Sequence, residues 1–284
     1  MRRLLLISFV AVVKFALVPA SANAAGISVD AGLTPAEDRW IFRTQMRYMQ
    51  RKEDPTPMDR KMSTYTFPVV LAYGLRPDLT LMLRQTVMNQ ETSMAGSSSR
   101  NTGLGDLFIL GKYKLYRRNT PDYTFGIAST LGLELPTGAD SFTSETWDLQ
   151  PGLYTSWRRG PWATDFNVAY TLNGFADRGS GDINPGNELS LDWALAHQFS
   201  FGEKARVSLA PVLELSYKNI SPDRLYGRDV SNTGESVLYL SPGIKFTISS
   251  FILEALIQIP AWQDQKGFQL KRGTGIIVGT RFMF

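Results

Sequence analysis

The stretch that decides the fold is RGTGIIVGTRFMF, residues 272–284, where the chain ends on an aromatic residue. Alternate residues from Ile276 to Phe284 are mostly apolar, whereas the positions between them include Gly279 and Arg281. Successive side chains of a β-strand point to opposite faces. Chain termini are usually polar, because exposing apolar side chains to water at a loosely held end is unfavourable. The pattern therefore predicts a strand that places one face against an apolar medium.

The first residues predict export. Two arginines precede an apolar run, residues 4–18, which is interrupted by Lys14 and followed by the small-residue site Ala22-Asn23-Ala24. This order is typical of a secretory signal peptide, and the lysine argues against a single anchoring helix. We expect residues 1–24 to be the signal peptide and residues 25–39 to form a short periplasmic N-terminal segment.

Composition excludes several classes of protein. The chain has 30 Lys+Arg and 26 Asp+Glu, and the predicted signal peptide removes three basic residues, which leaves 27 against 26. A nearly neutral mature chain gives no argument for a nucleic-acid partner. The chain has no cysteine, so disulfide scaffolds, thiolate metal sites and cysteine nucleophiles are excluded.

From Trp40 to the end of the chain, the hydrophobic pattern has a period of two. Short turns alternate with longer polar loops, which is typical of an up-and-down meander. We predict an all-β fold, a transmembrane antiparallel β-barrel of about 12 strands over residues 40–284, with short periplasmic turns and longer extracellular loops. The predicted strands are 40–51, 65–73, 79–88, 105–116, 123–135, 147–157, 162–175, 188–199, 205–218, 235–248, 251–259 and 273–284.

Charged side chains indicate which face of these strands points inward, because they occupy the parity opposite to the apolar stripe. A Lys or Arg facing lipid at the bilayer midplane costs roughly 2–4 kcal/mol. A soluble sandwich or lipocalin-like barrel also alternates, but with its apolar face inside. The export signal, the strand lengths and the apolar chain end favour the membrane barrel. The charged residues interpreted as lining a lumen or solute path are Arg43, Arg47, Asp106, Lys112, Glu134, Asp148, Asp165, Asp192, Arg206, Glu214, Glu254 and Arg281.

Proline interrupts four of the predicted strands. A proline lacks the N–H that a central strand donates to its neighbour, so it is usually confined to edges and bulges. We therefore expect bulges or bends at Pro68, Pro151, Pro211 and Pro242.

Catalytic motifs are scarce. His197 is the only histidine, and it lies beside a predicted periplasmic turn. A serine-type lipase acting on the outer leaflet needs its histidine on the loop side, next to a serine and an orienting group. The histidine is therefore interpreted as structural or interfacial. No catalytic, cofactor-binding or metal-binding residues are predicted, and the protein is not expected to be an enzyme.

Several segments resemble one family of outer-membrane barrels. They are Gly103-Leu104-Gly105-Asp106-Leu107, LELPTG at 133–138, WDLQPGLYTSW at 147–157 and YLSPGIKF at 239–246, together with the turn in YGLRPDLTL at 73–81. In this order, from about residue 60 to the end, they are similar to the family called "putative MetA-pathway of phenol degradation". The resemblance implies barrel architecture and passage of aromatic or other small apolar molecules across the outer membrane, and it supplies no defined substrate residues.

These observations predict a porin-like channel for passive passage of a small solute of aromatic or hydrophobic character. Two alternatives stay open, a structural or adhesive barrel without transport and an outer-membrane lipid hydrolase. The expected location is the bacterial outer membrane of a Gram-negative cell. The expected partners are outer-membrane lipid, lipopolysaccharide, the small solute, and the barrel assembly machinery, which would recognise the last strand through Phe282 and Phe284.

Overall fold

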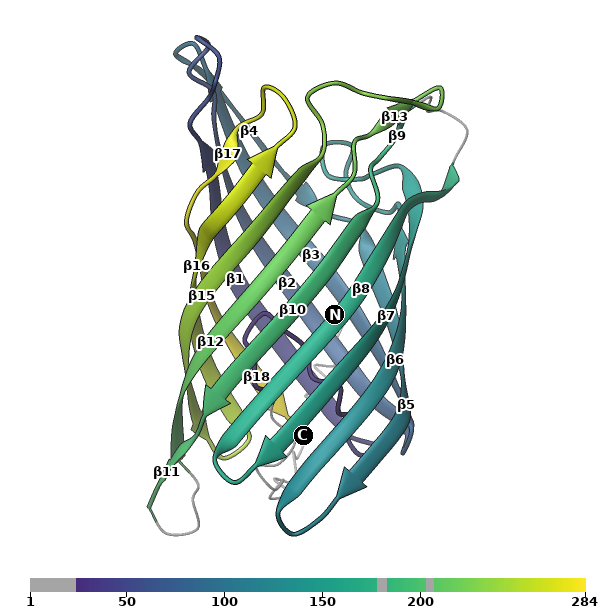
Figure 1. Ribbon diagram of the computed structural model, residues 1–284, viewed down its shortest axis with the longest axis vertical. Helices are drawn as coiled ribbons and strands as arrows, with labels where there is room; N and C mark the ends of the chain where they lie inside the picture. Colours follow the sequence, from purple (N-terminus) through teal and green to yellow (C-terminus); the bar gives the residue numbers. More distant parts are fainter. Residues whose placement is uncertain (1–23, 178–182, 203–206) are drawn as a thin grey trace, which may run out of the picture.

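Twelve antiparallel strands form a closed barrel (Figure 1). The computed structural model describes residues 24–177, 183–202 and 207–284, so the predicted signal peptide lies almost entirely outside the described residues. None of the described residues forms a helix long and apolar enough to cross a membrane. The barrel strands are β1 (Trp40–Lys52), β2 (Lys61–Arg76), β3 (Leu79–Met94), β5 (Leu107–Asn119), β6 (Tyr123–Leu135), β7 (Thr146–Arg159), β8 (Trp162–Asp177), β10 (Glu188–His197), β12 (Val207–Ile220), β15 (Glu235–Ile248), β16 (Phe251–Gln265) and β18 (Gly275–Met283).

The last strand closes the barrel against the first one. Each strand pairs with its sequence neighbours in an up-and-down order, and β18 pairs with both β16 and β1. Arg43 lies opposite Arg281 in this ladder, and the main chains of Trp40 and Phe284 exchange both hydrogen bonds at its end. Closure leaves no open sheet edge in the membrane, where backbone groups have no water to bind. The predicted fold class is confirmed.

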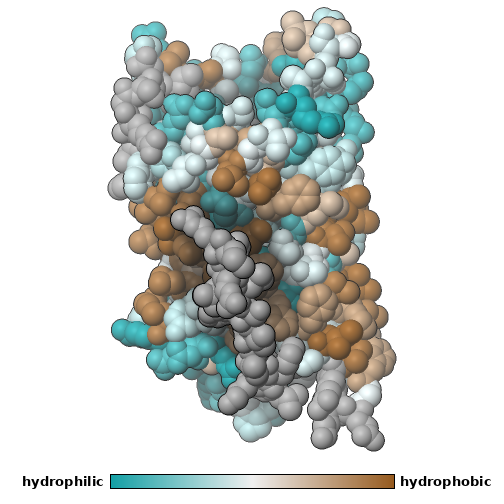
Figure 2. Space-filling view, turned by 180° about the vertical axis from the view of Figure 1, so that it is seen from behind, coloured by the Kyte–Doolittle hydropathy of each residue, from teal (hydrophilic) through white to brown (hydrophobic). Residues whose placement is uncertain are grey.

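The outer face carries an apolar belt. Figure 2 shows brown, hydrophobic side chains across the middle of the barrel and teal, hydrophilic ones towards both ends. On β18, Val278 is exposed and its neighbour Gly279 is buried. On β16, Ile257 is exposed and Glu254, of the opposite parity, is buried. The alternation inferred from the sequence therefore has its apolar face outward, as a lipid-facing barrel requires.

The strands extend further on the loop side than the hydrophobic pattern indicated. β3 continues to Met94 and turns at Ala95-Gly96, both with positive φ, into β4 (Ser97–Leu104). This hairpin occupies part of the region predicted as a loop. Its residues are polar, because beyond the membrane a strand needs no apolar face. The remaining short strands are β9 (Ile183–Asn184), β11 (Phe199–Phe201), β13 (Arg224–Leu225), β14 (Arg228–Asp229) and β17 (Lys271–Arg272).

None of the four strand prolines forms a bulge, so the expected bulges were wrong, whereas the expected bends stay a prediction. The register is the same before and after Pro68, Pro151, Pro211 and Pro242, and each of them pairs with one neighbouring strand. The ladder with the other neighbour is interrupted at each proline. The register shifts lie elsewhere, for example between Gly74 and Arg76. A proline removes one donor but inserts no extra residue, so it need not change the register of the ladder.

Tight packing at Gly279 gives a test of barrel closure. A Cβ atom at this position would lie 2.5 Å from Gln45 Cγ and 2.8 Å from the Thr44 carbonyl oxygen. Overpacking of this kind costs about 1–3 kcal/mol. We expect Gly279→Val to lower the temperature at which the folded band is lost in a heat-modifiability gel. The matched control is Val278→Ile on the lipid face, which should leave that temperature unchanged. Equal temperatures for both variants would contradict the close β1–β18 packing.

Candidate functional site

The chain enters its own barrel before the first strand. Residues 24–34 are called here the plug segment. The segment starts at the turn-side mouth, the end of the barrel with the short turns, where Ala24 lies near those turns. Ser28 and Asp30 lie further inside, and Leu33 and Thr34 are back beside Trp40 at the start of β1.

The residues of the plug segment alternate like a strand, and Ala25, Ile27 and Val29 are buried in one hydrophobic cluster with lumen-facing side chains of the wall. The wall residues of this cluster are Ala194, Ala196, Val212, Leu256 and Ile277, with Ala163 packed against them.

Two carboxylates bind the amide groups of the plug segment. Glu214 accepts hydrogen bonds from the main-chain N–H groups of Ile27 and Ser28 and from the Ser28 hydroxyl. Asp165 accepts one from the Ala25 N–H at 2.6 Å. Neither carboxylate has any solvent-exposed surface. Hydrogen bonds to an ionised group are about twice as strong as neutral ones, so these contacts fix the segment at two heights.

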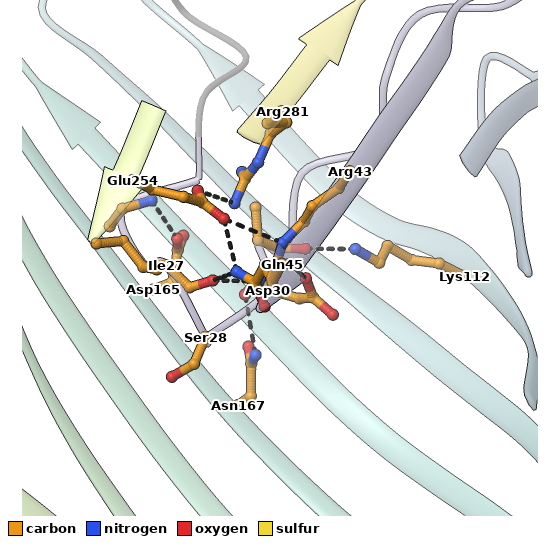
Figure 3. A network of polar contacts seen from close by, with 12 residues as sticks. Ile27, Ser28, Asp30, Arg43, Gln45, Lys112, Asp165, Asn167, Glu254 and Arg281 are labelled. Carbon is orange, nitrogen blue, oxygen red and sulfur yellow. Dashed lines mark hydrogen bonds and ion pairs between the residues drawn. The ribbon is translucent and has the colours of Figure 1, made fainter. Parts of the chain in front are cut away.

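Cations and amides of the wall bind the carbonyl oxygens of the same segment (Figure 3). Arg43 and Gln45 both donate to the Ile27 carbonyl, the latter at 3.1 Å. The remaining donors are the Lys112 ammonium to Ala31, 2.6 Å, the Asn167 amide to Asp30, 2.9 Å, and the Lys245 ammonium to Ala25, 2.7 Å. The plug segment forms no strand, so side chains supply the hydrogen bonds that a sheet would otherwise provide.

Glu254 connects these contacts to the barrel seam. Its carboxylate is 3.3 Å from the Arg43 guanidinium and 3.2 Å from that of Arg281, and it accepts a 2.6 Å hydrogen bond from Gln45. Asp30 of the plug segment also pairs with Arg43, at 3.3 Å. A buried carboxylate without such partners would be costly. Glu254 of the wall and Asp30 of the plug segment both have them, and Arg43 links the two carboxylates.

This location differs from the expected periplasmic segment over residues 25–39. The sequence carries a signal for it that we did not use. Leu256 and Ile277 are apolar yet share the inward parity of Glu254 and Arg281, and an apolar side chain in a water-filled lumen would gain nothing. Apolar residues on the inner face indicate that apolar side chains of another segment pack against them inside the barrel.

A cavity of about 550 Å³ opens above the plug segment, on the loop side. Ser28 and Asp30 of the plug line one side of it, and Arg47 of β1 and Arg84 of β3 line the wall. Two smaller cavities of about 330 Å³ lie on the turn side, one between the plug and the wall and one near the turns. The plug segment therefore lies between the loop-side cavity and the turn-side mouth, and the cavities on its two sides share the lining residues Asp30, Arg43, Val70 and Met82.

The loop after β6 folds over the loop-side cavity. Asp106 accepts hydrogen bonds from the N–H groups of Gly138, 2.8 Å, and Ser144, 2.9 Å, and from the Ser144 hydroxyl, 3.3 Å. Phe142, on the same loop, lines the cavity. Asp106 is thus an anchor for a loop that narrows the lumen from the loop side.

The predicted lumen residues fall into three groups. One group contacts the plug segment or the network that holds it, and comprises Arg43, Arg47, Lys112, Asp165, Glu214, Glu254 and Arg281. A second group lies nearer the loops, where Glu134 pairs with Arg84, Asp148 accepts from Gly174 and Asp192 accepts from Ser216, with Asp106 as the loop anchor. Arg206 lies outside the described residues. Sequence reasoning missed Gln45, Asn167 and also Ser156, whose hydroxyl oxygen accepts a 2.7 Å hydrogen bond from the Gly32 N–H of the plug. It followed charges and passed over neutral polar residues of the same parity.

His197 lies at the turn side, away from the loop-side cavity. Its ring is 4.5 Å from the Trp162 ring and 4.6 Å from the Phe199 ring. No group of three or more His, Cys, Asp or Glu side chains suited to a metal ion occurs among the described residues.

A family model described as "Putative MetA-pathway of phenol degradation" matches residues 56–265. The chain belongs to this family. The match begins in the loop after β1 and ends with β16, so it includes neither the plug segment nor β18. Comparison with curated protein sequences finds no match.

Two solved structures place the fold among outer-membrane barrels. The COG4313 outer membrane channel from Pseudomonas putida F1 is 16% identical, with a TM-score of 0.66 over 90% of this chain and 100% of that chain. The β-domain of the Bordetella autotransporter BrkA is 11% identical, with a TM-score of 0.50 over 88% of this chain and 100% of that chain. At these identities the likeness establishes the architecture.

The Glu214 carboxylate should control how often the plug segment leaves its place. Replacing it by glutamine weakens contacts that are each worth about 1.5–3 kcal/mol, which corresponds to roughly 10- to 100-fold more frequent exposure of the segment. Since the chain has no cysteine, a single Ile27→Cys reports this exposure directly. We expect a thiol reagent to label Ile27→Cys slowly, and faster when Glu214→Gln is added.

The matched control is Glu91→Gln, because Glu91 lies on the outer hairpin and pairs with Arg100 at 2.6 Å. It should not change the labelling rate. Rapid labelling of Ile27→Cys in the otherwise unchanged protein would contradict a buried plug.

Proposed function

We propose that this protein is an outer-membrane channel for passive passage of a small solute and that residues 24–34 act as its plug. The plug segment lies inside the lumen between the loop-side cavity and the turn-side mouth, and side chains of the wall hold it there. A segment outside the sheet can leave without opening the barrel. This arrangement is the observation that carries the proposal.

Further support comes from the family and the fold. The family description refers to phenol degradation, and the COG4313 protein is named as an outer membrane channel. The solute class that follows from the family description is small and aromatic. The export signal and the apolar belt are consistent with the outer membrane as the location.

Removal of residues 25–34 tests the proposal. The link from Pro35 onward is kept, because Asp38 and Arg39 are hydrogen-bonded to Gly74 of β2. We expect the shortened protein to show higher single-channel conductance and faster liposome flux of small aromatic solutes than the full mature chain. A heat-modifiability gel verifies that the shortened barrel is folded.

The two alternatives predict different outcomes. A structural or adhesive barrel predicts no solute flux from either protein, even though the shortened barrel is folded. An outer-membrane lipid hydrolase predicts lipid turnover that His197→Ala abolishes. Absence of flux in both proteins would overturn the channel proposal, and turnover dependent on His197 would replace it.

A further inference from the structure

Arg47 stands out in the loop-side cavity because no carboxylate of the described residues pairs with its guanidinium. Its guanidinium donates two hydrogen bonds, from Nε at 2.9 Å and from Nη2 at 2.7 Å, both to the neutral amide oxygen of Gln45. It forms no ion pair with any carboxylate of the described residues. A guanidinium has five N–H donors, so three remain available on the side of the cavity that Arg47 lines.

The nearest carboxylates are already shared by other cations. Asp30 pairs with Arg43, and Glu254 pairs with both Arg43 and Arg281. Three guanidinium groups, including that of Arg47, therefore face two carboxylates at this level of the lumen. Of these three, Arg47 is left without a carboxylate partner, because the other two cations are directly paired.

The other two carboxylates that line the cavity, Glu134 and Asp106, make the lining neutral in total, but neither of them pairs with Arg47. Glu134 lies 3.6 Å from the guanidinium of Arg84, and Asp106 is bound to the loop amides described above. Arg84 also places its guanidinium over the Phe108 ring, 4.3 Å from the centroid. Each carboxylate of the cavity thus has its own partner.

Apolar side chains complete the wall of the cavity. Met82, Met88 and Val70 line it from β2 and β3, and Phe142 lines it from the overlying loop. Its volume, about 550 Å³, is in the range of small-molecule sites, which combine apolar walls with a few polar groups that orient the ligand. A guanidinium is suited to a carboxylate, because the planar fork offers two parallel N–H donors.

We propose that this cavity binds a small organic anion, an aromatic carboxylate, with its carboxylate on Arg47 and its ring among Met82, Met88 and Phe142. The proposal rests on the channel function and names the class of solute. The ligand replaces the missing counter-ion of Arg47 while its apolar part covers the methionines.

Three probes of nearly equal shape test the charge requirement. They are benzoate, neutral benzamide and cationic benzamidine. We expect benzoate to bind the purified, detergent-solubilised full mature chain in calorimetric titration at low ionic strength, and the other two to bind at least tenfold more weakly. Arg47→Gln should weaken benzoate binding about tenfold to a hundredfold. Arg47→Lys should retain part of the affinity, since it keeps the charge without the fork.

The matched control is Arg100→Gln, which removes the same charge from the exposed β3–β4 hairpin and should leave benzoate binding unchanged. The ratio of benzoate to benzamide flux into liposomes gives a second readout, because a plug loosened by the loss of Arg47 speeds both solutes alike. Unchanged benzoate binding and an unchanged flux ratio in Arg47→Gln would overturn the anion site. If Arg47→Gln loses benzoate binding while neither it nor the unchanged protein shows any flux, the anion-site proposal stands and the channel proposal is overturned.

Discussion

The bilayer core contains no water, and this constraint governs the rest of the molecule. Every backbone N–H and C=O in the wall must be bonded within the chain, so the sheet has to close, which it does where β1 meets β18. Closure divides each strand into a lipid face and a lumen face. Charged side chains are then confined to the lumen, where they require partners because a buried unpaired charge is costly.

The plug segment and the lumen charges satisfy one another. An extended segment without a strand partner carries free amide and carbonyl groups, which are costly when buried. The lumen carries carboxylates, ammonium groups and guanidinium groups, and burying any of these charges without a partner is also unfavourable. Glu214 and Asp165 bind the amides, while Arg43, Lys112 and Lys245 bind the carbonyls. Several charged residues that the sequence analysis assigned to a solute path therefore bind the plug segment.

The sequence predicted the barrel well because the membrane imposes a two-residue period on every spanning strand. The predicted strands overlap all twelve barrel strands, and the first one matches β1 to within one residue. The loop-side extensions were missed because strands outside the membrane lose that period, as in Ser97–Leu104. The position of the plug was missed because its alternation of Ala25, Ile27 and Val29 with polar residues or glycine is short. Several of its contacts join residues more than a hundred positions apart, as Ile27 and Glu214 do, and no local pattern reports such pairs.

The link between the plug and the wall has a consequence for how the lumen closes. Asp38 and Arg39 are bonded to Gly74, so the plug segment stays attached at the turn-side mouth whatever its position. It behaves as an intramolecular ligand, whose effective concentration at its own site is on the order of millimolar for short flexible linkers. Because the segment is part of the same chain, its return to that site would not depend on protein concentration. An open lumen would be a transient excursion, ended by the chain's own first residues.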